Sequence, residues 1–183
     1  MARVPYLDTD DVAPEHRDLL ETGLNLYRAL GHAPDSARQF RELGMHIRYH
    51  IKLDPRLREL AILQVGYLSR APYEYTHHIE IGRRVGVSDE DLRAIALEGS
   101  GAVSALPVLD RMVLQAAREL VAGPEMSADC YSELETLLGR ECLVELVLTI
   151  SFYCGVVRVL GALEIDVEPA YQDLLREFPF APE

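Results

Sequence analysis

Residues 53–78 read LDPRLRELAILQVGYLSRAPYEYTHH and contain two helical segments separated by a short link. The first segment begins at Pro55 and is apolar on nearly every side as far as Leu68, which is typical of a helix buried in a core. Pro72 suits the first position of the second segment, because a helix needs no backbone N–H there. Since residues 69–71 form a short link, we expect the two helices to be antiparallel neighbours.

Helical periodicity also dominates on both sides of this hairpin, and the alternation typical of strands is nearly absent. Before a polar end of the chain, we expect further helices over residues 14–30, 36–51, 88–97, 107–121, 127–138, 140–164 and 169–177. The length of 183 residues is sufficient for one domain with a sizeable core. The sequence therefore predicts an all-α fold in a single domain, with a helical extension over residues 1–52, a core over 53–165 and a tail over 166–183.

The composition is acidic, with 30 Asp and Glu against 18 Lys and Arg and a net charge of −12. Nucleic-acid binding without sequence preference needs a basic surface that neutralises phosphates, so no nucleic-acid partner is expected. An acidic surface is also a usual means by which a cytosolic protein stays in solution. We therefore interpret the charge as a solubility feature that indicates no particular substrate.

The three cysteines, Cys130, Cys142 and Cys154, are too few for a disulfide framework and form no Cys-x-x-Cys pair. Together with an N-terminus that lacks an apolar signal segment, they favour a reduced, cytoplasmic location. The most apolar stretch, residues 143–163, is interrupted by two charged side chains. We therefore expect a helix buried on most sides, not a membrane span, and no membrane partner.

Three side chains of the hairpin are expected to come together. Glu59 lies in the most apolar helix, where a carboxylate must be paired, hydrogen-bonded or protonated because burying an isolated charge costs several kcal/mol. Glu74 and His78 are four residues apart and therefore share one face of the next helix. From the rise per residue, His78 should lie about one turn from Glu59, a gap that two long side chains can bridge. These three residues are candidates for acid–base catalysis.

Other interpretations of the same residues stay open. The helix dipole alone favours Glu74 in a first turn, and Glu59 can form a structural salt bridge with a neighbouring arginine such as Arg58. His77 points about 100° away from His78, so at most one imidazole faces the Glu59 helix and the other is expected to be partly solvated. Metal-ligand types are present, but the His-Glu-x-x-His spacing is absent, so no metal is expected.

At these residues the chain resembles the carboxymuconolactone decarboxylase family, whose fold is shared with the alkylhydroperoxidase D proteins. The resemblance is carried by residues 53–63, 73–78, 86–89, 143–146 and 152–153 and, as in longer members of the family, by 27–30 and 163–166. It implies an alkylhydroperoxidase D-like helical domain with extra N-terminal helices. It also implies self-assembly as a homotrimer or homohexamer.

The peroxidase branch of this family uses a Glu, a Cys-x-x-Cys pair, and a His four residues beyond the second Cys. These positions correspond to Glu59, Ala71, Glu74 and His78, so the Glu and the His are kept while both cysteines are absent. Reduction of a peroxide by a thiolate pair needs a nucleophilic and a resolving sulfur. The resemblance therefore favours the decarboxylase side of the family and disfavours peroxidase activity.

Decarboxylase-like members act on small carboxylated lactones or carbonyl compounds from aromatic compound degradation. Loss of CO₂ from such a lactone leaves electron density that the conjugated carbonyl absorbs, so no cofactor is expected. The enzyme must then stabilise a dienolate-like intermediate and deliver a proton. We expect His78 to donate that proton, Glu59 to orient His78 and tune its pKa, and Glu74 to complete the catalytic set.

Polar side chains near this set are the candidates for binding a small-molecule substrate. An arginine would hold a substrate carboxylate, and a tyrosine would donate a hydrogen bond to the developing oxyanion. Interface packing is the alternative for each tyrosine, and an exposed helix edge is the alternative for the arginine of the last long helix. The candidates are Tyr73, His77, Arg58 and Tyr153, together with Tyr75 and Arg158.

The leading hypothesis is a cofactor-independent lyase that decarboxylates its substrate. Isomerisation or dehydration through the same enolate chemistry would use the same residues. Two hypotheses from other classes stay open: a thiol-dependent alkylhydroperoxide reductase-like antioxidant protein, and a non-catalytic helical oligomer in which Glu59 and His78 form a buried structural pair. The retained Glu and His without redox cysteines favour the lyase.

Overall fold

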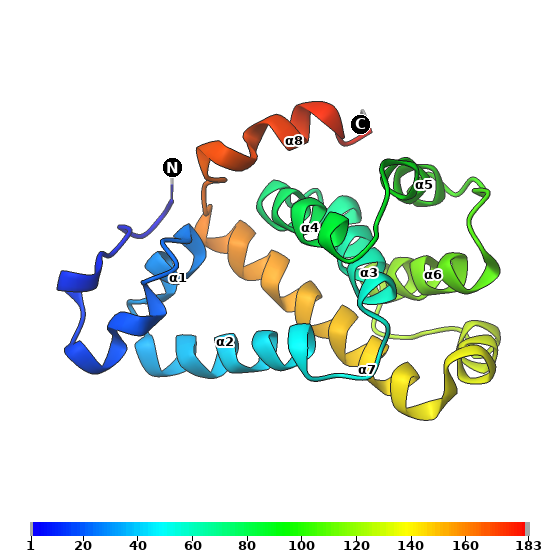
Figure 1. Ribbon diagram of the computed structural model, residues 1–183, viewed down its shortest axis with the longest axis horizontal. Coiled ribbons are helices and arrows are strands. Elements are labelled where there is room, and N and C mark those ends of the chain that lie inside the picture. The colour runs from blue at the N-terminus through cyan, green and yellow to red at the C-terminus, as the bar shows by residue number, and fades with distance from the viewer. Residues whose placement is uncertain (1, 182–183) are drawn as a thin grey trace.

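The computed structural model describes residues 2–181, and all regular secondary structure in that part of the chain is helical, which confirms the predicted all-α class (Figure 1). Short 3-10 helices cover Thr9–Asp11, Pro14–Leu19 and Pro169–Tyr171. The α-helices are α1 (Asn25–Leu30), α2 (Pro34–Tyr49), α3 (Pro55–Leu68), α4 (Pro72–Arg84), α5 (Asp89–Gly99), α6 (Val108–Ala122), α7 (Ala128–Leu163) and α8 (Gln172–Glu177).

Helix α3 is the centre of the core and contacts α4, α5, α6 and α7. Its start is capped by Asp54, whose carboxylate accepts the backbone N–H groups of Arg56 and Leu57 at 2.9 and 3.1 Å. Every residue from Leu57 to Tyr67 is buried, as expected for a helix that is apolar on nearly all sides. The predicted helix is therefore confirmed, and any polar group on it has to find its partners inside the protein.

Helix α4 follows the short link and packs against α3, which completes the predicted hairpin. Pro72 stands at its start, as expected. Gly66 allows the two helices to approach closely, because a Cβ at this position would lie 3.2 Å from the backbone of Tyr75. This close packing brings the polar residues of the two helices within reach of one another.

Helix α7 is two helices that meet at Gly139, whose φ of 75° and ψ of 162° are not helical. This backbone conformation is open essentially only to glycine, which explains why the chain turns there. The break confirms the predicted division into helices over residues 127–138 and 140–164. Helix α7 contacts α3 and α6 in the core and also contacts α2 (Figure 1).

By length and hydropathy, α7 is also long and apolar enough to cross a membrane. The two charged side chains in residues 143–163 therefore do not exclude a span, contrary to the expectation from sequence. A core helix meets the same criteria, and 44% of the most apolar window of α7 is buried within the fold. One helix of this kind is weak support for a membrane protein.

The N-terminal region departs from the prediction of one helix over residues 14–30. A 3-10 helix ends at Leu19, and α1 begins only at Asn25, because Gly23 with its φ of 69° turns the chain between them. Helix α2 begins at Pro34, before the expected cap at residues 35–36. The predicted apolar face of α2 is also incomplete, since Leu43 is 47% exposed.

The end of the chain is less polar than predicted. A 3-10 helix and α8 together occupy the range 169–177 that was expected to be one helix. Beyond them, the side chain of Phe178 is buried, and Phe180 packs against the rings of Tyr67 and Tyr75. The Tyr67 hydroxyl accepts the backbone N–H of Ala181 at 3.1 Å. Aromatic contacts therefore hold the C-terminal segment against the hairpin. The ribbon shows α8 beside α4 (Figure 1).

Candidate active site

The imidazole of His78 lies between two carboxylates, one from each helix of the hairpin. Its Nδ1 is 2.6 Å from Glu59 Oε2, and its Nε2 is 2.9 Å from Glu74 Oε1. Arg58 extends the row, because its Nε and Nη2 donate to Glu59 Oε1 at 3.0 and 2.9 Å. All four side chains are buried. The structure thus brings Glu59, Glu74 and His78 together, while their chemical roles stay a prediction.

Neighbouring charges determine the protonation of this buried row, Arg58–Glu59–His78–Glu74. Burial disfavours the imidazolium, but the carboxylates of Glu59 and Glu74 outweigh it and raise the pKa of His78 to about 9. Burial also disfavours the Glu59 carboxylate, yet the charges of His78 and Arg58 lower its pKa. The row therefore holds an imidazolium whose two ring nitrogens each lie close to one carboxylate oxygen, Nδ1 at 2.6 Å and Nε2 at 2.9 Å.

A cavity of about 110 Å³ lies beside the buried row. Glu74 and His78 form part of its wall, whereas Glu59 and Arg58 do not line it. Most of the remaining wall is apolar and comes from the N-terminal region, α2, α4 and α7. A small molecule in this cavity would therefore meet Glu74 and His78 directly, and Glu59 would act on it only through His78.

The three candidate tyrosines differ in whether they line the cavity. Tyr153 lines the cavity next to His78, with the two rings edge-on and 5.0 Å apart between centroids. Burial, with a further contribution from the charge of Glu74, raises the pKa of Tyr153 well above its ordinary value, so its hydroxyl remains a donor. Tyr73 also lines the cavity, whereas Tyr75 points away and packs against Tyr67. Tyr75 therefore fits the packing alternative, and Tyr73 and Tyr153 remain the candidates at the cavity.

The arginines expected from sequence to hold a carboxylate are engaged elsewhere. Besides Glu59, Arg58 bonds through Nη1 to the backbone oxygen of Arg48 at 2.8 Å. Arg158 is exposed on α7 and donates to the Cys154 carbonyl. The arginine that does line the cavity is Arg48 of α2, which sequence reasoning missed because it placed this helix in an extension outside the core.

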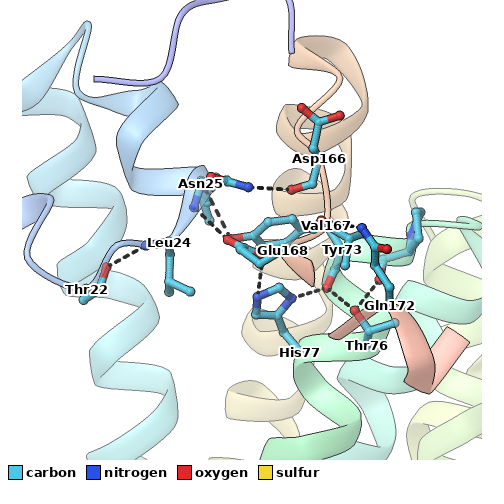
Figure 2. A network of polar contacts seen from close by, with 12 residues as sticks. Thr22, Leu24, Asn25, Tyr73, Thr76, His77, Asp166, Val167, Glu168 and Gln172 are labelled. Carbon is cyan, nitrogen blue, oxygen red and sulfur yellow. Dashed lines mark hydrogen bonds and ion pairs between the residues drawn. The ribbon is translucent and has the colours of Figure 1, made fainter. Parts of the chain in front are cut away.

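The second imidazole, His77, belongs to another polar network, centred on Glu168 after α7 (Figure 2). Its Nε2 is 3.0 Å from Glu168 Oε2. The other oxygen of Glu168 accepts the Tyr73 hydroxyl at 3.0 Å and the Asn25 backbone N–H at 2.7 Å. The His77 ring is stacked between Tyr73 and Tyr171, at 4.2 and 3.8 Å. The expectation that His77 is partly solvated is therefore wrong, because the C-terminal segment covers it.

Glu168 connects walls of the cavity that are far apart in sequence. Tyr73 and His77 line the cavity from α4, and Leu26 lines it from α1. The Tyr73 hydroxyl, which donates to Glu168, also accepts the backbone N–H of Leu26 at 3.3 Å. Burial opposes ionisation of Glu168, but hydrogen bonds from His77 and Asn25 outweigh it and lower its pKa. No local sequence signal reveals this residue, because it lies 95 positions after Tyr73.

The cysteines lie away from the cavity. Cys130, Cys142 and Cys154 are free thiols, and none of them is in the cavity wall. Burial raises the pKa of all three, to about 11 for Cys130, which disfavours the reactive thiolate. Within residues 2–181, no group of three or more His, Cys, Asp or Glu side chains is arranged to hold a metal ion.

Similar solved structures define the fold class. The chain is similar to the alkylhydroperoxidase AhpD core of an uncharacterized peroxidase-related protein from Ralstonia eutropha JMP134, with a TM-score of 0.79, 18% identity, and coverage of 93% of this chain and 94% of that one. It is also similar to the apo debrominase Bmp8, with a TM-score of 0.75, 18% identity, and coverage of 96% and 97%. A cysteine-to-alanine variant of Bmp8 in complex with 2,3,4-tribromopyrrole gives the same TM-score and identity, with coverage of 97% and 100%. These likenesses show an alkylhydroperoxidase D-like fold.

A family model matches the central part of the sequence. The sequence model of the carboxymuconolactone decarboxylase family matches residues 34–119, a range that contains Glu59, Glu74 and His78. This match covers less than half of the chain and agrees with the resemblance found from its motifs. A comparison with curated proteins finds no match.

Proposed function

We propose that this protein is a cofactor-independent enzyme that transfers protons on a small carboxylated lactone or carbonyl compound, with decarboxylation as the nominal reaction. The observation that carries the proposal is the imidazolium of His78 held between two buried carboxylates, one of which lines a largely apolar cavity. Such a cavity strengthens electrostatic interactions and suits acid–base chemistry.

The geometry favours Glu74 as the group that exchanges a proton with the substrate. Both nitrogens of His78 face carboxylates, so a proton leaving Nε2 has Glu74 Oε1 as its nearest acceptor, at 2.9 Å. Glu59 holds the opposite nitrogen and is itself held by Arg58. In this proposal His78 supplies the proton, Glu74 carries it to the cavity, and Glu59 is a positioning residue.

The proposed decarboxylation follows from these positions. The carbon–carbon bond to the departing carboxylate breaks, CO₂ leaves, and the electron pair moves into the conjugated carbonyl to form a dienolate. The Tyr153 hydroxyl, which burial keeps protonated, donates a hydrogen bond to the developing oxyanion. The Glu74 carboxylate then accepts the proton from His78 Nε2 and delivers it to the carbon, which returns Glu74 to its carboxylate form, and solvent reprotonates His78.

Replacement of Glu74 by Gln tests this assignment. With lactones that carry a carboxylate and a conjugated carbonyl as substrates, Glu74→Gln should reduce turnover by about 10²- to 10⁴-fold, the usual contribution of a general acid or base. Glu80→Gln on the same helix is the matched control, because Glu80 is paired with Arg84 at the surface. Helical circular dichroism should be unchanged in both variants. Turnover that survives in Glu74→Gln would overturn the assignment.

A further inference from the structure

Arg48 stands out among the polar residues of the cavity because its charge is not matched. The Nε atom of Arg48 is buried and has no hydrogen-bond partner, and among residues 2–181 no carboxylate lies within salt-bridge distance of its guanidinium. Arg58, by contrast, is fully engaged with Glu59. A buried donor without a partner is costly, so a position of this kind in a cavity wall points to a ligand that supplies the acceptor.

The position of Arg48 is tied to the buried row. Its backbone oxygen accepts Nη1 of Arg58, which fixes the end of α2 against Glu59. Its guanidinium carbon lies 5.1 Å from the ring centre of the exposed Tyr49, and its charge acts on the hydroxyl of Tyr153 inside the cavity. Arg48 therefore lies between the exposed ring of Tyr49 and the Tyr153 hydroxyl inside the cavity.

The carboxylates around the cavity already have partners. Glu59 and Glu74 are held by Arg58 and His78, and Glu168 is held by His77. Arg48 is therefore the cation of the cavity wall that none of these carboxylates pairs with. An anion with one negative charge would pair with Arg48 without disturbing the His78 contacts.

The shape of the cavity limits what that anion can be. The rings of Phe40 and Phe152 lie 5.0 Å apart between centroids on one side, and Gly44 keeps space open because a Cβ there would contact Phe152 at 3.5 Å. An engineered apolar cavity of about 150 Å³ accepts a benzene ring. The present volume of about 110 Å³ therefore suits a flat five-membered ring and a short substituent.

We propose that Arg48 is the specificity-determining residue of this site and anchors a carboxylate that the substrate keeps throughout the reaction. The inference rests on the proposed function. It predicts that the substrate carries one carboxylate that is kept and another that departs. A carboxylate paired with a guanidinium is stabilised as an anion, which opposes its loss as CO₂. The departing carboxylate must therefore lie in the apolar part of the cavity near Glu74, and the product must retain the carboxylate bound to Arg48.

Binding of furan-2-carboxylate, a flat five-membered ring with one carboxylate, tests Arg48 without relying on turnover. Arg48→Gln should lower the affinity for furan-2-carboxylate, measured by calorimetry, by about 10- to 100-fold, which is the usual contribution of a charge-assisted hydrogen-bonded pair. The uncharged furan-2-carboxamide should bind the wild type and Arg48→Gln equally. Arg41→Gln on the same helix is the matched control, because Arg41 is paired with Asp18.

The possible outcomes separate this inference from the proposed function. Loss of carboxylate binding alone in Arg48→Gln supports the inference, even if Glu74→Gln retains turnover and the proposed function fails. If Arg48→Gln weakens the binding of furan-2-carboxylate and furan-2-carboxamide equally, the inference is overturned, because Arg48 would then only support the cavity wall. Unchanged acid binding in the variant, or no acid binding by the wild type, would also overturn it.

Discussion

Replacement of His78 by Gln removes a group whose pKa the fold raises from 6.5 to about 9. A pKa that is higher in the folded than in the unfolded protein means that protonation stabilises the folded state. The difference of about 2.5 between the two values corresponds to about 3 kcal/mol, because each pKa unit is worth about 1.4 kcal/mol. This stabilisation is fully present below pH 6.5 and is lost as the pH rises through about 9. The difference in free energy of unfolding between wild type and His78→Gln should therefore shrink by about 3 kcal/mol over that interval.

Chemical denaturation at several pH values between about 6 and 10, followed by helical circular dichroism, measures this change. Protein concentration has to be held constant, since self-association would alter apparent stability. Comparing two proteins at each pH cancels the titration of buried cysteines and tyrosines. His50→Gln, at an exposed histidine after α2, is the control and should show no comparable trend. A difference that stays constant across the interval would refute the view that Glu59 and Glu74 hold an imidazolium.

Gly139→Ala should lower the free energy of unfolding by about 1–3 kcal/mol because its backbone conformation is open essentially only to glycine. Gly155→Ala lies in the helical part of α7, where a Cβ would have open space, and should instead raise the free energy of unfolding by about 0.5–1 kcal/mol. The same change at both sites in urea denaturation would contradict the break at residue 139. Glu168→Ala should raise KM more than it lowers kcat, because it loosens Tyr73 and His77 in the cavity wall without touching the reacting groups; steady-state kinetics in which only kcat falls would argue against this role. A dithiol-coupled hydroperoxide assay should give the same background rate for the wild type and a cysteine-free variant, because burial raises the pKa of every thiol; activity that disappears with the cysteines would restore the peroxidase hypothesis.

The central hairpin and its row of charges were open to prediction because their determinants are local. Proline positions, a short link and the rise of a helix are sufficient to place Glu59 near His78, and Glu74 shares a helix face with His78. The observed 2.6 Å contact between His78 and Glu59 is the outcome of that regular geometry. The turn at Gly139 was predictable for the same reason.

The rest of the cavity depends on contacts between distant segments, which one sequence does not reveal. Arg48 enters the site only because α2 packs against α7, and nothing near it in the sequence marks it as a binding residue. His77 is buried only because Glu168 and Tyr171 fold back over it. Local periodicity specifies which face of a helix a residue occupies, but it does not specify which segment covers that face.

The Glu168 network also affects the order in which the cavity is completed during synthesis. The wall around Asn25 is synthesised 143 residues before the carboxylate that holds it to Tyr73 and His77. At a synthesis rate of about 5–20 residues per second, Glu168 is added roughly 7 to 30 seconds after Asn25. A nascent chain that has already formed the α3–α4 hairpin therefore has its charged row before it has a closed cavity. A complete binding site consequently requires that the chain has been synthesised beyond Glu168.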